Sequence, residues 1–138
     1  PATLISLNNL ATMYQKMGKY KQAEPIYLTL LQKQEEQYGL THPQNTSLNN
    51  NIGWLYLDMQ SNQCLQYFER CLLHWNNTDD WKFHWIKLGI ALYEFTNTKN
   101  NNQLQVAMTN LVDILGANHS RIIKSHKRIE LIKKFHTT

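Results

Sequence analysis

Proline and glycine are scarce in this sequence, whose 138 residues include only three prolines and five glycines. Short strands joined by tight turns need more of both residues, so the scarcity favours long helices. Cysteine is scarcer still, and Cys64 and Cys71 are the only two. They stand seven residues apart in a helix-like stretch, about 10 Å along the helix axis, which is too far for a disulfide. A hydrophobic core must therefore hold the fold.

Long apolar runs are also missing, and residues 1–6 lack the charged start and the apolar segment of a signal peptide. The sequence therefore predicts a protein without a membrane span. Two free thiols suit a reducing compartment. We expect a cytoplasmic location.

Known catalytic and metal-binding motifs are absent too. The six histidines and two cysteines fall into no His-Glu-x-x-His or Cys-x-x-Cys spacing, and there is no glycine-rich phosphate loop. We therefore expect no enzymatic activity, no cofactor, no metal and no small-molecule substrate. A catalytic domain fused upstream of this segment is left open.

Charge is distributed unevenly along the chain. Residues 1–120 carry eight Lys or Arg and nine Asp or Glu, whereas residues 121–138 carry six and one. Such a basic end suits nucleic acid phosphates or anionic lipid. Aromatic side chains that would stack on bases are scarce there, however, and a solubilising terminal helix needs the same charge. Electrostatic binding to nucleic acid or membrane is therefore kept only as the alternative function.

The strongest signal in the sequence is an internal repeat. Residues 8–14, Asn-Asn-Leu-Ala-Thr-Met-Tyr, align with residues 50–56, Asn-Asn-Ile-Gly-Trp-Leu-Tyr, at a spacing of 42. A weaker third copy begins near Trp81 and carries Leu-Gly-Ile-Ala-Leu at residues 88–92. Fixed periods of this size are typical of helical repeat arrays.

Each repeat is predicted to contain two helices. In the first repeat, apolar residues recur at three- and four-residue steps over 7–14 and again over a second helix at 20–38. Small residues recur in register, and they let paired helices approach closely beside a large ring. These small residues are Ala11, Gly53 and Gly89 in the first helices, and Ala23, Cys64 and Ala107 in the second.

At these residues the sequence resembles the tetratricopeptide repeat (TPR), specifically the 42-residue type found in kinesin light chains. The second repeat departs from that pattern, because Met59 to Asn62 replace the turn glycine and tyrosine. The third is degenerate, with a polar insertion at Thr96 to Asn102 in its turn. The matching runs of the first repeat are Ser6 to Tyr14, Gly18 to Tyr27, Tyr38-Gly39 and His42-Pro43.

The resemblance implies an all-α fold, a right-handed α-solenoid of antiparallel helix pairs in one domain over 1–138. The expected parts are repeat one at 1–42, repeat two at 43–77, a degenerate repeat three at 81–115 and a capping helix at 119–136. Pro1 stands where Pro43 stands, so we expect the chain to be the C-terminal part of a longer array. The capping helix should cover the last repeat with Ile122, Ile129, Ile132 and Phe135.

In this family the first helix of each repeat lines a concave groove. The resemblance therefore implies a non-catalytic protein–protein interaction scaffold that binds a peptide segment of a partner protein in the groove. Asparagine amides both donate and accept hydrogen bonds, so they suit an extended backbone, and aromatic rings supply apolar anchors. The implied groove residues are Asn8, Thr12, Gln15, Lys16, Asn50, Trp54, Leu57, Asp58, Ile86, Ile90 and Tyr93.

Several alternatives stay open for these residues. Asn8 and Asn50 are expected either to contact the ligand or to be solvated or bonded to a nearby loop, and Trp54 either to face the ligand or to pack against the third repeat. Lys16 and Asp58 also read as ordinary exposed charges. Finally, an array cut before its first repeat exposes an apolar face, so self-association through the first helix is possible at Leu4, Leu7 and Leu10.

Overall fold

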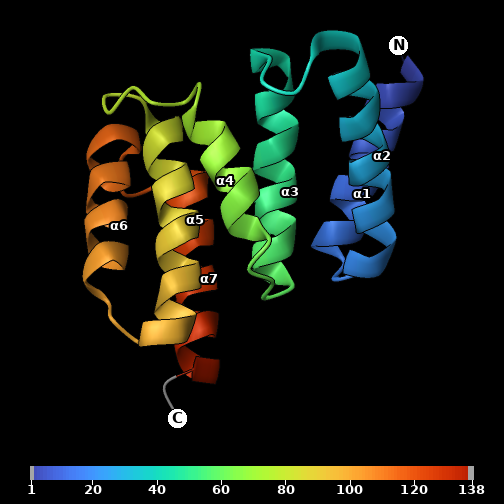
Figure 1. Cartoon of the computed structure of the whole chain (residues 1–138). Coiled ribbons are helices and arrows are strands. Elements are labelled where there is room, and N and C mark those ends of the chain that lie inside the picture. The colour runs from blue at the N-terminus through green and yellow to red at the C-terminus, as the bar shows by residue number, and fades with distance from the viewer. Residues whose placement is uncertain (1, 137–138) are drawn as a thin grey trace. The chain divides into compact units, whose positions relative to one another are not determined.

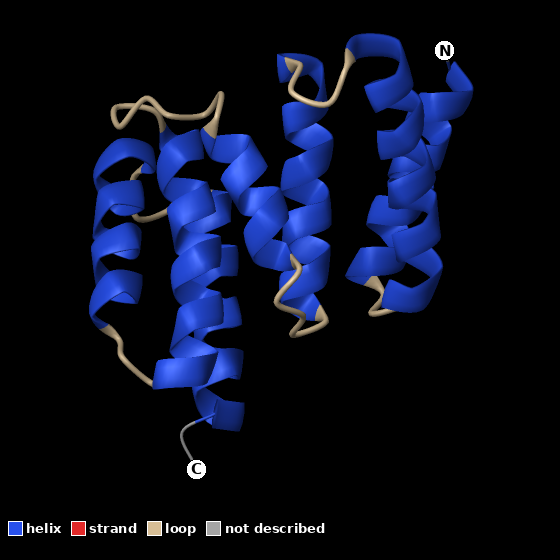
Figure 2. Ribbon diagram, viewed as in Figure 1, coloured by secondary structure: helices blue, strands red, loops and turns tan. Residues whose placement is uncertain are grey.

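The computed structural model describes residues 2–136, and side chains for residues 4–134. Within this part the chain forms seven α-helices and one 3-10 turn (Figure 1), with loops between them and no strand (Figure 2). The all-α prediction is confirmed, and so is the arrangement in antiparallel helix pairs. Pro1 lies outside the described residues. None of the described helices has the length and apolar character needed to cross a membrane.

The chain divides into two compact units, residues 1–74 and 75–138, each with its own packed interior. We call them unit 1 and unit 2. Unit 1 holds the two helix pairs of the first and second repeats, and unit 2 holds the third pair and the last helix. One continuous domain over 1–138 stays a prediction.

Unit 1 is built from α1 (Ala2–Lys16), α2 (Tyr20–Tyr38), α3 (Thr46–Asp58) and α4 (Cys64–Leu72), with the 3-10 turn η1 (Pro43–Asn45) before α3. Helix α1 packs along α2, α3 packs along α4, and α2 also contacts α3. These contacts are those expected when one helix pair stacks on the next. The predicted helix at 20–38 is observed with the same bounds.

A close approach between α3 and α4 shows why small residues recur. A β-carbon placed on Gly53 would stand 2.6 Å from Cε1 of Phe68, closer than real β-carbons come to other atoms. The Phe68 ring fills that space and meets the Trp54 ring edge-to-face, with centroids 5.5 Å apart. The predicted pairing of a small residue with a large ring is therefore seen in the second repeat.

The turn between α3 and α4 keeps its shape without the glycine of the first repeat. Gly18 has φ +75°, and Gln60, which stands 42 residues later, has φ +57°. The same closing hydrogen bond is made in both turns, from Lys19 N to Tyr14 O at 2.8 Å and from Ser61 N to Tyr56 O at 2.8 Å. Because a side chain is unfavourable at positive φ, Gln60 stores backbone strain that Gly18 does not.

Unit 2 is a three-helix unit of α5 (Trp81–Thr98), α6 (Asn102–Leu115) and α7 (Ser120–His136). Helices α5 and α6 form the third antiparallel pair, and α7 contacts both of them (Figure 1). The α5 helix starts where the Asp80 carboxylate accepts a 3.0 Å hydrogen bond from Lys82 N. A side-chain oxygen at this position satisfies a backbone N–H that has no partner within the helix.

The polar insertion predicted at Thr96 to Asn102 is largely wrong as a turn, because α5 continues through Thr98. The Thr96 and Thr98 hydroxyls donate to the backbone oxygens of Tyr93 and Glu94, at 2.6 and 3.0 Å. A threonine hydroxyl can donate its hydrogen bond to a backbone oxygen of the same helix in this way. Threonine therefore does not have to end a helix, although its helix propensity is low. Lys99, with φ +60°, ends the helix, and only residues 99–101 lie between α5 and α6.

Helix α7 is held on α5 and α6 by its apolar stripe and by one cation. Ile122 and Ile129 are buried and Ile132 is half-buried, whereas the side chain of Phe135 lies outside the described residues. The Arg121 guanidinium sits 4.4 Å from the centroid of the Trp81 ring and 5.2 Å from that of Trp85. Burial lowers the pKa of Arg121 from its usual range, because desolvation disfavours the charged guanidinium.

Candidate functional site

The groove residues predicted on α1 lie along one side of that helix. Asn8, Thr12 and Gln15 are half-buried, and Lys16 is exposed in the last turn. The Thr12 hydroxyl donates to Asn8 O at 2.9 Å, a bond within the helix. The spacing of Asn8, Thr12 and Gln15 at four and three residues puts them on the same face.

A hydrogen-bonded network joins three of the predicted residues. The Tyr27 hydroxyl of α2 donates to Gln15 Oε1 at 3.1 Å and lies 3.0 Å from the Thr12 hydroxyl. Gln15 Nε2 in turn donates to an Asp58 carboxylate oxygen of α3 at 3.2 Å. Burial raises the pKa of Tyr27, and the hydrogen bond with Thr12 opposes that rise. The network therefore fixes α1 against α2 and α3 with a neutral tyrosine at its centre.

This network changes the role expected of Gln15 and Asp58. Both were predicted as ligand contacts, and each already has a partner 43 residues away in the sequence. Asp58 is half-buried. A ligand that used either side chain would have to share it with this bond, so the pair is better placed to position the surface than to grip a peptide.

The predicted residues of α3 split into two groups. Trp54 and Leu57 are buried, with exposed fractions of 5% and 4%, and Trp54 contacts Phe68. Asn50 is half-buried, and its Oδ1 atom has no hydrogen-bond partner in the described part of the chain. Asn8 Oδ1 on α1 has the same environment. The aromatic anchor expected at Trp54 is thus part of the core, whereas the two asparagines keep an unused acceptor.

A cleft of about 340 Å³ opens within unit 1 beside Asn8. It lies between the N-terminal parts of α1 and α3, and the C-terminal half of α2 forms its floor. Half of its lining is apolar, namely Leu4, Ile5, Leu30, Pro43 and Leu48, and the other half is polar, namely Asn8, Gln34, Gln44, Ser47 and Asn51.

The cleft is electrically neutral and contains unused acceptors. No lining side chain is charged, and the Oε1 atom of Gln34, like Oδ1 of Asn8, is buried without a hydrogen-bond partner among the described residues. Ile5 at its edge is 65% exposed. Buried acceptors in native proteins nearly always have a partner, and neither of these two oxygens has one among the described residues.

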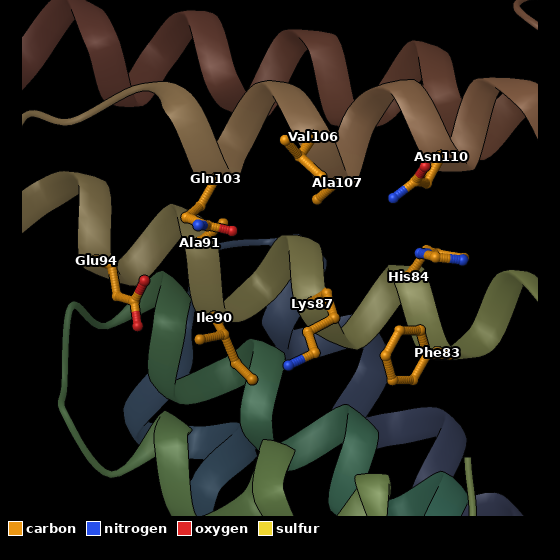
Figure 3. A pocket seen from close by; sticks show the side chains of 10 residues that line it. All are labelled: Phe83, His84, Lys87, Ile90, Ala91, Glu94, Gln103, Val106, Ala107 and Asn110. Atoms are coloured by element: carbon orange, nitrogen blue, oxygen red, sulfur yellow. The ribbon is translucent and has the colours of Figure 1, made fainter. Parts of the chain in front are cut away.

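The predicted residues of α5 lie in unit 2. Ile86 is fully buried, Tyr93 is half-buried, and Ile90 is half-buried. Ile90 lines a groove of about 450 Å³ between α5 and α6, shown in Figure 3. Ile86 therefore belongs to the core, whereas Ile90 is available at the surface.

Metal-ligating side chains do not gather within the described residues. No cluster of three or more His, Cys, Asp or Glu side chains within them is arranged to hold a metal ion. Cys64 and Cys71 are free and buried, and burial raises their pKa values to about 11 and about 12. A thiol in that state is protonated near neutral pH and is a poor nucleophile.

Several residues of the site were not predicted from the sequence. Tyr27 was not among the predicted groove residues, yet its hydroxyl links Thr12 to Gln15. Gln34 and Asn51 line the cleft, and their only sequence signal was a polar residue on a helix. Neither periodicity nor spacing reveals which polar residue of α2 lies under α1 and α3.

Comparison with known families supports the predicted internal repeat. Residues 2–72, which make up just over half of the chain, match a family model described as tetratricopeptide repeat. No curated protein and no solved structure matches the chain significantly. The match covers the part of the chain that contains α1 to α4 and the cleft. The kinesin-light-chain subtype stays a prediction.

Proposed function

We infer that this chain, which belongs to the tetratricopeptide repeat family of protein–protein interaction scaffolds, binds a peptide segment of a partner protein in the cleft of unit 1. The repeats of this family are generally non-catalytic interaction modules. The observation that carries the proposal is the neutral cleft with two unused acceptor oxygens, from Asn8 and Gln34.

The composition of the cleft favours an uncharged stretch of peptide. An extended peptide presents backbone N–H groups that need acceptors, and the oxygens of Asn8 and Gln34 supply two. The apolar half of the lining, around Ile5 and Leu48, offers area for one aliphatic or aromatic side chain. A volume of about 340 Å³ is small for a binding site, so we propose that only a few residues of the partner enter it.

The network at the other end of α1 supports the same proposal. Gln15 and Asp58 tie α1 to α3, and Tyr27 ties α1 to α2, so the helices that line the cleft are held in place before a ligand arrives. A preorganised surface loses less conformational entropy on binding. Asn50 repeats the unpaired oxygen of Asn8 one repeat later, so we propose that it extends the same surface.

The test uses a phage-displayed library of random linear peptides selected on the purified chain. Peptides that are enriched are then measured against the variant Asn8→Ala with Gln34→Ala. We expect the dissociation constant to rise about tenfold, because two hydrogen bonds to the peptide backbone are lost. The matched control is Asn9→Ala with Gln37→Ala, which removes two exposed amides from the same two helices. Circular dichroism checks that both variants stay folded.

Salt dependence separates this proposal from binding through the basic end of the chain. A neutral cleft should bind its peptides equally well at low and high ionic strength, whereas lysines and arginines lose affinity for phosphates or lipid as salt rises. Arg121 is already held between two tryptophans, which leaves fewer cations of α7 for such a partner. Peptides that bind both double variants equally and are released by salt would overturn the cleft proposal.

A further inference from the structure

The groove between α5 and α6 presents a surface that peptide binding in unit 1 does not use. Its α5 wall carries Lys87, Ile90, Ala91 and Glu94, and its α6 wall carries Val106 and Ala107. In Figure 3 the side chains of Lys87, Ile90 and Glu94 extend from α5 on the side away from α6. Lys87 and Glu94 are exposed, and Val106 is 55% exposed. The groove is therefore open, with an apolar middle between two opposite charges.

This surface is distinct from the one that α7 covers. Helix α7 contacts α5 at Trp81 and Trp85 through Arg121, and the groove begins at Phe83 and Lys87. Residues two positions apart lie about 200° apart around a helix, so the groove is on the side of α5 turned away from this contact. The α7 helix does not line it.

The charges on α5 are self-complementary. Lys87 and Glu94 are seven residues apart, which is about 10.5 Å, or two turns, along the same face of the helix. When two copies of α5 lie antiparallel, each Lys87 meets the Glu94 of the other copy, and two equal ion pairs form about a two-fold axis. Within the described residues neither side chain is in an ion pair. We propose that a second copy of this chain docks on this groove to form a symmetric dimer.

The middle of the surface fits the same axis. The axis falls between Ile90 and Ala91, close to the centre of α5 (Trp81–Thr98). Each Ile90, which is half-buried, then lies beside the Ala91 of the other copy, whose small side chain is only 4% exposed and leaves room for it on both sides of the axis. Val106 adds exposed apolar area at the edge of the same contact.

The sequence also limits the choice of occupant. Only one other pair of opposite charges is seven residues apart, Asp80 and Lys87. Asp80 caps the start of α5 and pairs with Lys82 at 3.8 Å, and an axis at that point would overlap only the helix end. No other helix of the chain carries charges at the spacing the groove requires, so the complementary element within the chain is α5 itself.

Charge reversal tests the dimer directly. In a symmetric contact, Lys87→Glu changes both ion pairs to like-charge pairs, and so does Glu94→Lys. We expect each single variant to weaken dimerisation about tenfold or more, measured by sedimentation equilibrium, and the double variant Lys87→Glu with Glu94→Lys to restore it. Lys127→Glu and Glu130→Lys on α7 are matched controls that change the net charge equally.

A second measurement identifies the contact itself. A carbodiimide joins an amine and a carboxylate that touch, without adding a spacer. In the cross-linked band of twice the monomer mass, we expect mass spectrometry to find a bond between Lys87 of one copy and Glu94 of the other. Mixing isotope-labelled with unlabelled chains distinguishes this bond from one within a single chain.

Clear outcomes would overturn the dimer. The proposal is wrong if the folded wild-type chain stays monomeric up to about 1 mM, the weakest range of specific association. It is also wrong if the dimer survives both single reversals and is lost instead with Ile5→Glu, because association would then run through α1. A monomeric chain leaves peptide binding by the unit 1 cleft untouched, whereas association through Ile5, which lines that cleft, would compete with it.

Discussion

The two compact units use the same helix-pair plan with different cores. Unit 1 packs rings against small residues, as Phe68 does against Gly53, and it stacks Tyr56 on Tyr67 with centroids 5.5 Å apart. Unit 2 has a mainly aliphatic core, and it uses two tryptophans to hold Arg121. The family match at residues 2–72 falls on unit 1.

The difference teaches which part of the repeat pattern the fold depends on. Pairing of α5 with α6 is as close as that of α1 with α2, although unit 2 lies outside the family match. Unit 2 keeps the small residues Gly89 and Ala107, and most of the other buried side chains around them are aliphatic. Aliphatic side chains of suitable volume can therefore take the place of the rings between two helices. The small residues are thus common to both units, while the rings beside them are a feature of unit 1.

The largest expected effect comes from removing the ring at the centre of unit 1. Phe68→Ala leaves a cavity between Gly53 and Trp54 and should lower the free energy of unfolding by about 4 kcal/mol. Urea unfolding followed by circular dichroism measures this, because the fluorescence of Trp54 would be mixed with that of the three tryptophans of unit 2. Leu73→Ala, at an exposed position of the same unit, should cost much less. Equal effects at both positions would contradict the ring-centred core.

Alkaline pH should weaken unit 1 next most strongly. Burial raises the pKa of Cys64 to about 11 and of Cys71 to about 12, from about 9 when unfolded. The folded state thus keeps protons that the unfolded state releases, so stability is complete below pH 9 and falls as pH rises toward the folded pKa values. We expect a loss of roughly 1 kcal/mol per thiol near pH 10, measured by urea unfolding.

The control for the pH effect is the variant Cys64→Ala with Cys71→Ala. Its unfolding free energy should change less between about pH 8 and about pH 10 than that of the wild type. Burial also raises the pKa of Tyr67, whose contribution begins at higher pH and remains in the variant. An unchanged slope in the variant would show that the thiols do not cause the loss.

In unit 2 the next largest effect on stability should come from Arg121, a half-buried cation. Arg121→Ala removes the guanidinium from between Trp81 and Trp85 and should lower the free energy of unfolding by about 1–2 kcal/mol. Tryptophan fluorescence should also change, because Trp81 and Trp85 lose their cover. Lys124→Ala, on the exposed side of α7, is the matched control. A loss no larger than that of the control would contradict the clamp.

The smallest effect concerns the two strained turns, one in each unit. Gln60→Gly and Lys99→Gly should each stabilise the chain by about 0.5–1 kcal/mol, because both positions have positive φ. The midpoint temperature of thermal unfolding, compared between each variant and the wild type, measures the gain in stability. Asn62→Gly, in the same turn as Gln60 but with ordinary φ, should not stabilise. Destabilisation by Gln60→Gly would mean that the side chain matters more than the strain.

Much of the fold could be predicted from the sequence, because helices depend on neighbours in the chain. The stripe at 7–14 and the helix at 20–38 are local patterns with a period near 3.6 residues, and both are observed. The end of α5 could not be predicted, because Thr96 and Thr98 read as turn residues by composition. In the structure their hydroxyls bond to the preceding turn of the helix.

The sequence by itself determined the helix pairs, their order and the small residues at which they meet, since all of these follow from periodicity and side-chain size. Only the tertiary structure decided which polar residues are left for a partner. Gln15 and Asp58 bind each other across 43 residues, Trp54 turns inward against Phe68, and Asn8 keeps an unused oxygen beside Gln34. The contacts of these side chains depend on which helices pack together. Helices far apart in the sequence can pack together without producing any periodic pattern in the sequence.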